Sequence, residues 1–218
     1  MALSKKDIIL AERAFFVKTL KGLKQSEWRA DTLCAGWDVE DLAAHLIVRE
    51  RGNIPARAGI VVPFLHHKHD AAITKMKRIG HQKMIAQLEK PPAWVKRLPF
   101  NVIEFYVHNE DLLRGKLGRS RVISDELEAA LSEFVPQLAR FAFRRVNDGF
   151  RLVIHDESSG ETHERSVGKF SEGSPELEIS GRAGELILLF MGRGKHAKVK
   201  SSGTDEAKRL YRLADIGI

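Results

Sequence analysis

The sequence of residues 38–47 is DVEDLAAHLI, a pattern typical of the start of a buried α-helix. Asp38 is a favourable N-cap, and Asp41 places a negative charge in the first turn, where the helix dipole favours it. The apolar residues that follow recur on one helical face: Leu42, Ala43, Leu46 and Ile47. His45 lies within this stripe and is therefore expected to point into the interior. A histidine in that position is either a hydrogen-bonded core residue or a metal ligand.

Further helical patterns surround this segment within the first 148 residues. They cover residues 5–22, 66–89, 101–115 and 124–146. Residues 51–65 contain two glycines and two prolines and are expected to form a loop. Antiparallel helices with short to moderate connections predict an up-and-down four-helix bundle for residues 1–148.

The pattern changes after Asn147-Asp148-Gly149, which is a turn signal. Strand patterns occupy residues 150–155, 162–167 and 176–180, and a helix at 181–191, a short strand at 198–201 and a helix at 204–214 follow. The sequence therefore predicts a two-domain protein, mainly α plus α+β. The bundle is expected at residues 1–148 and a small α+β domain at residues 149–218.

The bulk composition is that of a globular protein. The 218 residues are 43% hydrophobic and 30% charged, and no apolar run approaches the roughly 20 residues that a membrane helix needs. The N-terminal residues have the pattern of an amphipathic helix and not that of a signal peptide. Cys34 is the single cysteine, which excludes an internal disulfide and a multi-cysteine zinc site. These features predict a location in the reducing cytoplasm.

The formal net charge of +7 is carried by the first 148 residues. This region has 25 Lys/Arg against 18 Asp/Glu, whereas residues 149–218 have 11 of each. Residues 66–97 contain 8 basic and 2 acidic side chains. A basic face favours an anionic partner, although a solvated helix surface is the simpler interpretation. No zinc-finger spacing or RNA-binding aromatic motif accompanies the charge, so no clear nucleic-acid partner is indicated.

A second chemically informative run is EFYVH, which begins at Glu104. Glu104 and His108 are four residues apart and project from one face of a helix. With His45 they would supply two imidazoles and a carboxylate and leave coordination positions open, as a catalytic zinc or iron site requires. Asp41 and Asp111 lie at helical spacing from the two histidines and are candidates to orient them. Glu/His pairs at this spacing are common on surfaces, so the residues alone leave the core interpretation open.

Several segments resemble the DinB-like metal-binding superfamily, in particular its mycothiol-dependent maleylpyruvate isomerase branch. They are residues 33–46 (LCAGWDVEDLAAHL), 47–51 (IVRER), 104–111 (EFYVHNED) and 179–193 (ISGRAGELILLFMGR). The last resembles the sterol-carrier-like α+β domain of that branch. The resemblance implies a DinB-like bundle that binds one divalent metal ion through His45, Glu104 and His108. The chain departs from the branch at Asn109, where relatives often have a second histidine, and around Arg182, where they often have proline.

The resemblance also implies a function. A metal-dependent transferase or isomerase would use mycothiol, a low-molecular-weight thiol, on a small anionic substrate. Zinc is the expected metal, with nickel or iron as alternatives. A cleft between the domains is the natural place for thiol and substrate, with Arg182, Arg193 or Arg212 facing it. The alternative is a non-catalytic metal- or ligand-binding module with a basic docking face. The sequence indicates no catalytic residue and no oligomeric state.

Other side chains are expected to have structural roles. Cys34 has no predicted basic partner, so a small buried side chain is favoured over a nucleophile or ligand. Trp37 is expected to anchor its loop on the bundle. His66, His67 and His69 are predicted to form a surface cluster beside the basic helix.

Overall fold

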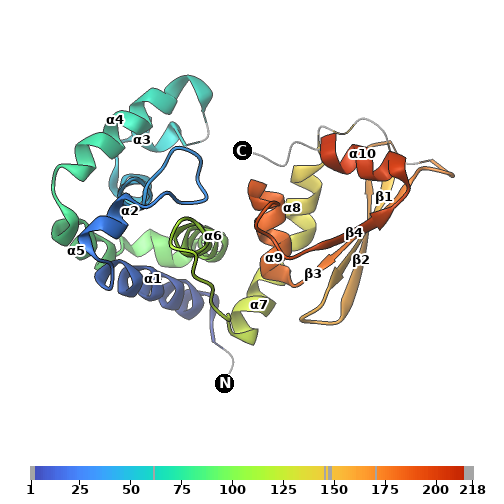
Figure 1. The fold of residues 1–218 in the computed structure, drawn as a ribbon, viewed down its shortest axis with the longest axis horizontal. Helices are drawn as coiled ribbons and strands as arrows, with labels where there is room; N and C mark the ends of the chain where they lie inside the picture. Colours follow the sequence, from blue (N-terminus) through green and yellow to red (C-terminus); the bar gives the residue numbers. More distant parts are fainter. Residues whose placement is uncertain (1–2, 61, 145, 147–148, 170, 214–218) are drawn as a thin grey trace. The chain divides into compact units, whose positions relative to one another are not determined.

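The computed structural model describes residues 3–60, 62–144, 146, 149–169 and 171–213. The chain forms two compact units, Met1–Arg121 and Val122–Ile218. The first is helical, and the second combines helices with a four-stranded mixed sheet (Figure 1). The predicted fold class, a helical part followed by an α+β part, is confirmed. No helix among the described residues combines the length and the apolar character needed to cross a bilayer.

The first unit is built from α-helices joined by loops and short 3-10 turns. The helices are α1 (Lys5–Lys21), α2 (Val39–Arg51), α3 (Ile54–Ala58), α4 (His66–Lys77), α5 (His81–Glu89) and α6 (Asn101–Arg114). The turns are η1 (Gln25–Arg29), η2 (Pro63–Leu65) and η3 (Ala93–Arg97). α1 packs against α5 and α6, while α2 packs against α4, α5 and α6. The helices predicted over residues 5–22, from Asp38 and over residues 101–115 are thus confirmed.

The start of α2 follows directly from its sequence. The Asp38 carboxylate accepts a hydrogen bond from the Asp41 amide at 2.8 Å, and the Asp41 carboxylate accepts one from the Asp38 amide at 3.2 Å. This reciprocal arrangement satisfies two amides that the helix itself leaves without partners. Leu42 and Leu46 then bury their side chains completely, and His45 on the same stripe is 5% exposed. Capping and burial together fix the direction in which His45 points.

The helix predicted over residues 66–89 consists of two helices. Gly80 lies between α4 and α5 with a φ of 84°, a left-handed conformation that glycine adopts without strain. The predicted loop at residues 51–65 also contains a helix, α3, whose N-cap Asn53 accepts a hydrogen bond from the Ala56 amide. Periodicity over a long window does not resolve such short breaks and short helices.

The bundle buries charged side chains that pair with one another. Arg13 of α1 and Glu50 of α2 are each 3% exposed and form a two-pronged ion pair, with 2.8 Å between Nη2 and Oε2. The Arg13 Nε also donates to the carbonyl of Leu88 in α5. Arg121 forms a similar two-pronged pair with Glu12 of α1. The Arg13 contacts tie α1 to both α2 and α5.

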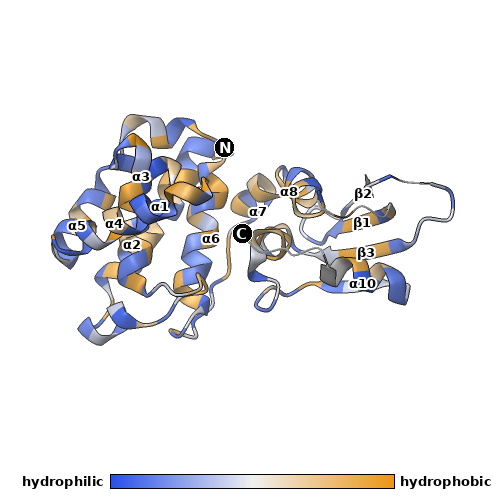
Figure 2. Ribbon diagram, turned by 90° about the horizontal axis from the view of Figure 1, so that it is seen from above, coloured by the Kyte–Doolittle hydropathy of each residue, from blue (hydrophilic) through white to orange (hydrophobic). Residues whose placement is uncertain are grey.

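The second unit begins with two helices that pack on the elements of the sheet region. Its elements are α7 (Asp125–Ser132), α8 (Val135–Ala142), β1 (Phe150–Asp156), β2 (Glu161–Val167), β3 (Glu176–Gly181), α9 (Ala183–Leu188), the π-type turn η4 (Leu189–Arg193), β4 (Lys200–Gly203) and α10 (Asp205–Leu213). The strand order is β2-β1-β3-β4, with β1 parallel to β3 and the other pairs antiparallel. Phe150, Leu152 and Ile154 alternate as buried residues along β1, and the apolar colour of β1 and β3 is visible in Figure 2. This alternation gives the sheet one buried face.

The two units meet in sequence at Arg121–Val122 instead of near residue 148. α7 contacts α9, and α8 contacts α9, η4 and β2, so both helices group with the sheet. Amphipathic periodicity identifies such helices but does not indicate which domain their apolar faces cover. The turn expected at Asn147-Asp148 lies outside the described residues.

Glu128 of α7 provides a pH-dependent test of the second unit. The side chain is 1% exposed and accepts a hydrogen bond from the Gly184 amide at 3.1 Å. Burial raises the pKa of the Glu128 carboxyl, although this hydrogen bond and the charge of Arg182 oppose the shift. A folded-state pKa above the unfolded one gives a contribution to stability that is present at low pH and lost as pH rises through the folded pKa. We expect the Glu128→Gln variant to gain stability over wild type as pH rises from about 4 to about 8.

Urea unfolding at several pH values measures this difference. Glu126→Gln is the matched control, because Glu126 is an exposed carboxyl of the same helix and a backbone hydrogen bond lowers its pKa. The control should not reproduce the gain. A free energy of unfolding for Glu128→Gln that runs parallel to wild type at all pH values would contradict the expectation.

Candidate metal centre

Three side chains from two helices of the first unit converge on one point. α2 contributes His45, and α6 contributes Glu104 and His108 one turn apart. Each offers a ligand atom, and these atoms lie within 4.8 Å of one another. Glu104 Oε1 is 3.6 Å from His45 Nε2 and 3.3 Å from His108 Nε2. The structure thus brings together the three residues that the sequence nominated.

The donor atoms suit a divalent transition metal. Two imidazole nitrogens and one carboxylate oxygen are a usual set of protein ligands of catalytic zinc. Ligand atoms about 2.0–2.2 Å from a tetrahedral ion lie about 3.3–3.6 Å apart, which matches the measured separations. His45 and His108 are 5% and 8% exposed, so their rings are held by packing. The residues present therefore fit such an ion.

The electrostatics of the cluster differ from residue to residue. Burial lowers the pKa of His45 to about 4, so this imidazole is neutral at neutral pH. Burial opposes charge on Glu104 as well, but the hydrogen bond from His108 and the charges of His108 and Arg49 hold the pKa of its carboxyl well below the usual range. Burial also opposes charge on His108, yet its hydrogen bonds, of which the one donated to Asp111 has the largest effect, raise its pKa well above the usual value. Glu104 and His108 thus form a charged pair, while His45 keeps one unprotonated nitrogen.

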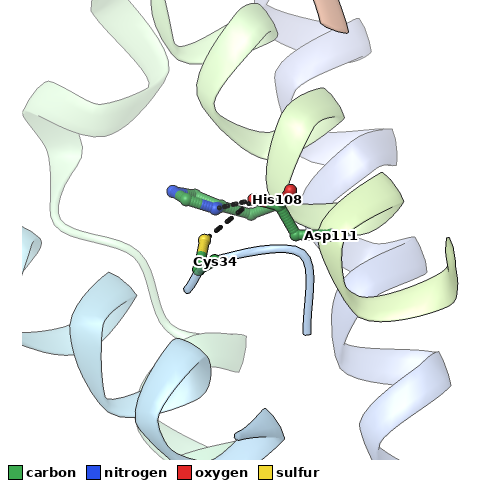
Figure 3. Close-up of side chains that lie close together, drawn as sticks. All are labelled: Cys34, His108 and Asp111. Atoms are coloured by element: carbon green, nitrogen blue, oxygen red, sulfur yellow. Dashed lines mark hydrogen bonds and ion pairs between the residues drawn. The ribbon is translucent and has the colours of Figure 1, made fainter. Parts of the chain in front are cut away.

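The ring of His108 is oriented by Asp111. His108 Nδ1 lies 2.9 Å from Asp111 Oδ2, and Asp111 is fully buried. The half-buried thiol of Cys34 donates to the same oxygen at 3.1 Å (Figure 3). A carboxylate on Nδ1 leaves Nε2 for the metal, which is the usual arrangement around metal-binding histidines. The predicted contact between Asp111 and His108 is confirmed, whereas the position of Cys34 beside it was not predicted.

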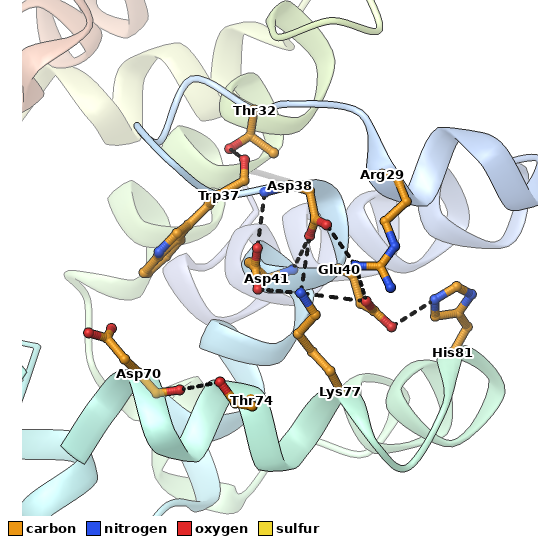
Figure 4. A network of polar contacts seen from close by, with 10 residues as sticks. All are labelled: Arg29, Thr32, Trp37, Asp38, Glu40, Asp41, Asp70, Thr74, Lys77 and His81. Carbon is orange, nitrogen blue, oxygen red and sulfur yellow. Dashed lines mark hydrogen bonds and ion pairs between the residues drawn. The ribbon is translucent and has the colours of Figure 1, made fainter. Parts of the chain in front are cut away.

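Asp41, the other predicted orienting carboxylate, does not contact His45, and that prediction is wrong. Its side chain is engaged at the helix start by Asp38 and by Lys77 of α4, whose Nζ is 2.6 Å away. Figure 4 shows Lys77 surrounded by the carboxylates of this helix start, with Glu40 also near it. Capping and ion pairing thus satisfy Asp41 away from the imidazole.

His69 occupies the position that Asp41 was expected to fill. His69 Nε2 lies 2.9 Å from His45 Nδ1, and His69 is 4% exposed. The predicted surface cluster of three histidines is therefore wrong for His69, while His66 and His67 are exposed as expected. α4 turns one face toward α2 and α3, and His69 lies on that face. The indole ring of Trp37 lies 4.8 Å from the His45 ring, measured between centroids.

Arg49 is a further charged residue at the cluster. Its Nε lies 2.9 Å from Glu104 Oε1, and its Nη2 donates to Asn101 Oδ1 at 2.6 Å. Its Nη1 is buried and has no hydrogen-bond partner among the described residues. The guanidinium lies near the ring of Trp94, with 5.9 Å to the centroid. Because Arg49 is four residues after His45, helical spacing could have indicated its place on the same face.

The three arginines nominated from the sequence belong to the second unit. Arg182 lies 3.6 Å from the Glu128 carboxylate, and Arg193 donates to the carbonyl of Met191. The side chain of Arg212 lies outside the described residues. The contacts described for Arg182 and Arg193 lie within the second unit.

The first unit is thus a helical bundle that brings two histidines and a glutamate together, and an α+β unit follows it in the sequence. Residues 9–90 match the family model of the mycothiol maleylpyruvate isomerase N-terminal domain. This match confirms the resemblance seen in the sequence. It includes His45 and His69, whereas Glu104 and His108 lie beyond it.

Two solved structures share the fold of the whole chain. The crystal structure of the mycothiol-dependent maleylpyruvate isomerase superposes with a TM-score of 0.60 and 16% identity over 91% of each chain. A histidine-to-alanine mutant of that enzyme gives a TM-score of 0.59, again at 16% identity and 91% coverage of each chain. A comparison with curated protein sequences finds no match. The similarity in structure therefore establishes the fold.

Proposed function

We propose that His45, Glu104 and His108 bind one divalent metal ion, and that the protein is a thiol-dependent isomerase or transferase of the mycothiol type. Zinc is the metal that this ligand set favours, and nickel or iron are alternatives. The observation that carries the proposal is the convergence of two Nε2 atoms on one carboxylate oxygen. When bound, such an ion supplies a Lewis acid that lowers the pKa of a water or thiol ligand.

The residues around the cluster support a reaction with an external thiol. Cys34 is the single cysteine, and its thiol lies on the Nδ1 side of His108, bonded to Asp111. The proposed metal ligands use the opposite ring nitrogen, Nε2. The thiol of the chain is therefore occupied away from the open positions of the metal. A low-molecular-weight thiol in a reducing cytoplasm fits this arrangement.

Arg49 supports a small anionic substrate. A guanidinium beside the ligands can donate a charge-assisted hydrogen bond to a carboxylate. Its buried Nη1 has no hydrogen-bond partner among the described residues, and an incoming carboxylate would satisfy that donor. Maleylpyruvate is the first substrate to test, because the solved structures that share the fold carry its name. The role of Arg49 is to bind and orient the substrate, while Trp37 shields one side of His45 from water.

Titration of the cobalt-substituted protein with mycothiol tests the thiol function. We expect a new thiolate-to-cobalt absorption band that saturates at one equivalent, because a thiolate occupies an open position of the metal. Glutathione serves as a comparison thiol, and Cys34→Ser serves as the control that excludes the protein's own thiol as the source of the band. Isomerisation of maleylpyruvate should depend on added mycothiol in the same preparation.

A cobalt spectrum that no cellular thiol changes would contradict the enzyme proposal. Stoichiometric metal without a thiol response would favour the non-catalytic module with a basic docking face. These two results separate metal binding from catalysis.

A further inference from the structure

We infer that His69 is a positioning residue that fixes the tautomer of His45 and so directs His45 Nε2 toward the metal. The inference rests on the proposed metal site. It is carried by a chain of hydrogen bonds that starts at a backbone carbonyl of α3, passes through two buried imidazoles and ends at the ligand cluster. Every member of this chain lies in the first unit.

The chain begins at Ala56, whose carbonyl oxygen lies 2.9 Å from His69 Nδ1. A carbonyl oxygen only accepts, so Nδ1 of His69 must carry a hydrogen. In a neutral imidazole the other nitrogen, Nε2, is then an acceptor. This nitrogen lies 2.9 Å from His45 Nδ1, which must therefore be the donor of the next hydrogen bond.

The hydrogen on Nδ1 determines the state of the opposite ring nitrogen of His45, Nε2. With its hydrogen on Nδ1, neutral His45 has its lone pair on Nε2, the atom 3.6 Å from Glu104 Oε1. The reversed tautomer would place a hydrogen on Nε2 and prevent it from binding a metal. His69 thus does for His45 what Asp111 does for His108, but without adding a negative charge.

Packing holds His69 in the position that this role requires. The imidazole is 4% exposed, and the ring of Trp37 lies 6.2 Å from it, measured between centroids. A Cβ on Gly59 would approach the Cβ of His69 to 2.9 Å and the carbonyl oxygen of Leu65 to 2.4 Å. Only glycine therefore lets α3 approach α4 closely enough for the Ala56 carbonyl to reach the imidazole.

Nitrogen-15 NMR of the metal-free wild-type protein, with histidine assignments, tests the tautomer directly. We expect His45 and His69 both to carry their hydrogen on Nδ1. A hydrogen on Nε2 of His45 in the wild type would overturn the inference. This measurement needs no bound metal, so it decides the inference even if metal binding, and with it the proposed function, fails.

Two substitutions then test the role of the acceptor. His69→Phe keeps an aromatic ring but removes the acceptor, and we expect the zinc dissociation constant to rise about 10- to 100-fold. His69→Gln can accept through Oε1, and we expect its affinity to stay within a few-fold of wild type. Chelator competition measures both values, with His67→Phe as the control at an exposed position of the same helix.

The cobalt spectrum gives a readout that altered folding stability alone does not move. His69→Phe should change the ligand-field bands of the bound cobalt, because His45 is no longer held in one orientation, and His69→Gln should restore them. Wild-type affinity and wild-type bands in His69→Phe would overturn the inference. If His69→Phe does not fold, the wild-type tautomer and the His69→Gln affinity decide it.

Discussion

Replacement of His108 by alanine is expected to abolish stoichiometric binding of a divalent metal ion. His108 supplies one of the two imidazole nitrogens that face Glu104 Oε1. The next residue is Asn109, so the adjacent position offers no second imidazole. Loss of an outer contact to a metal-binding histidine typically weakens binding about 10- to 100-fold. Loss of a ligand should exceed that range, so we expect the zinc dissociation constant to rise by at least about 100-fold. Chelator competition on tag-free protein measures it.

The matched controls separate the proposed site from its neighbours. His67→Ala removes an exposed histidine of α4 and should leave affinity unchanged. Cys34→Ser tests the second cluster of possible ligands, in which Cys34 and Asp111 lie around the Nδ1 side of His108. We expect that variant to keep its metal. Loss of metal in Cys34→Ser, with retention in His45→Ala, would move the site to the Cys34 cluster.

The second large effect is expected at the buried ion pair of Arg13 and Glu50. Both side chains are nearly inaccessible, and Glu50 holds the guanidinium through both carboxylate oxygens. Glu50→Ala leaves a buried arginine charge without its partner. Removal of one partner from such a pair typically costs about 3–5 kcal/mol, and we expect the free energy of unfolding to fall by that amount. Urea unfolding monitored by circular dichroism measures the change.

A surface pair provides the comparison. Lys21 of α1 and Glu89 of α5 form an ion pair between exposed side chains, so Glu89→Ala should change stability by at most about 1 kcal/mol. The double variant Arg13→Met, Glu50→Leu should recover much of the loss, because apolar replacements of a buried pair are often neutral or stabilising. Equal losses in the free energy of unfolding for Glu50→Ala and Glu89→Ala would contradict the larger effect expected for the buried pair.

Local patterns predicted the part of the site that lies along single helices. The cap at Asp38, the apolar stripe around Leu46 and the spacing of Glu104 and His108 are properties of neighbouring residues, and the structure agrees with each. The order of the two units also follows from the change of periodicity near residue 150. That two helices face one another across the cluster was indicated by resemblance, since periodicity alone does not pair helices.

Contacts between distant segments account for the incorrect predictions. His69 was assigned to the surface because α4 is basic, but its imidazole lies against His45 of α2 and the Ala56 carbonyl of α3. Asp41 has the correct helical spacing to His45, yet Lys77 and the helix cap engage it instead. α7 and α8 are amphipathic, and only tertiary contacts show that they pack against elements of the second unit. In each case the deciding partner is far away in sequence.

Anomalous X-ray scattering at the metal edge, from crystals of the metal-loaded protein, tests the central claim most directly. The proposed site predicts one strong peak per chain, about 2.0–2.2 Å from Nε2 of His45, Nε2 of His108 and a carboxylate oxygen of Glu104. A peak beside Cys34 and Nδ1 of His108, or no peak within the bundle, would contradict it.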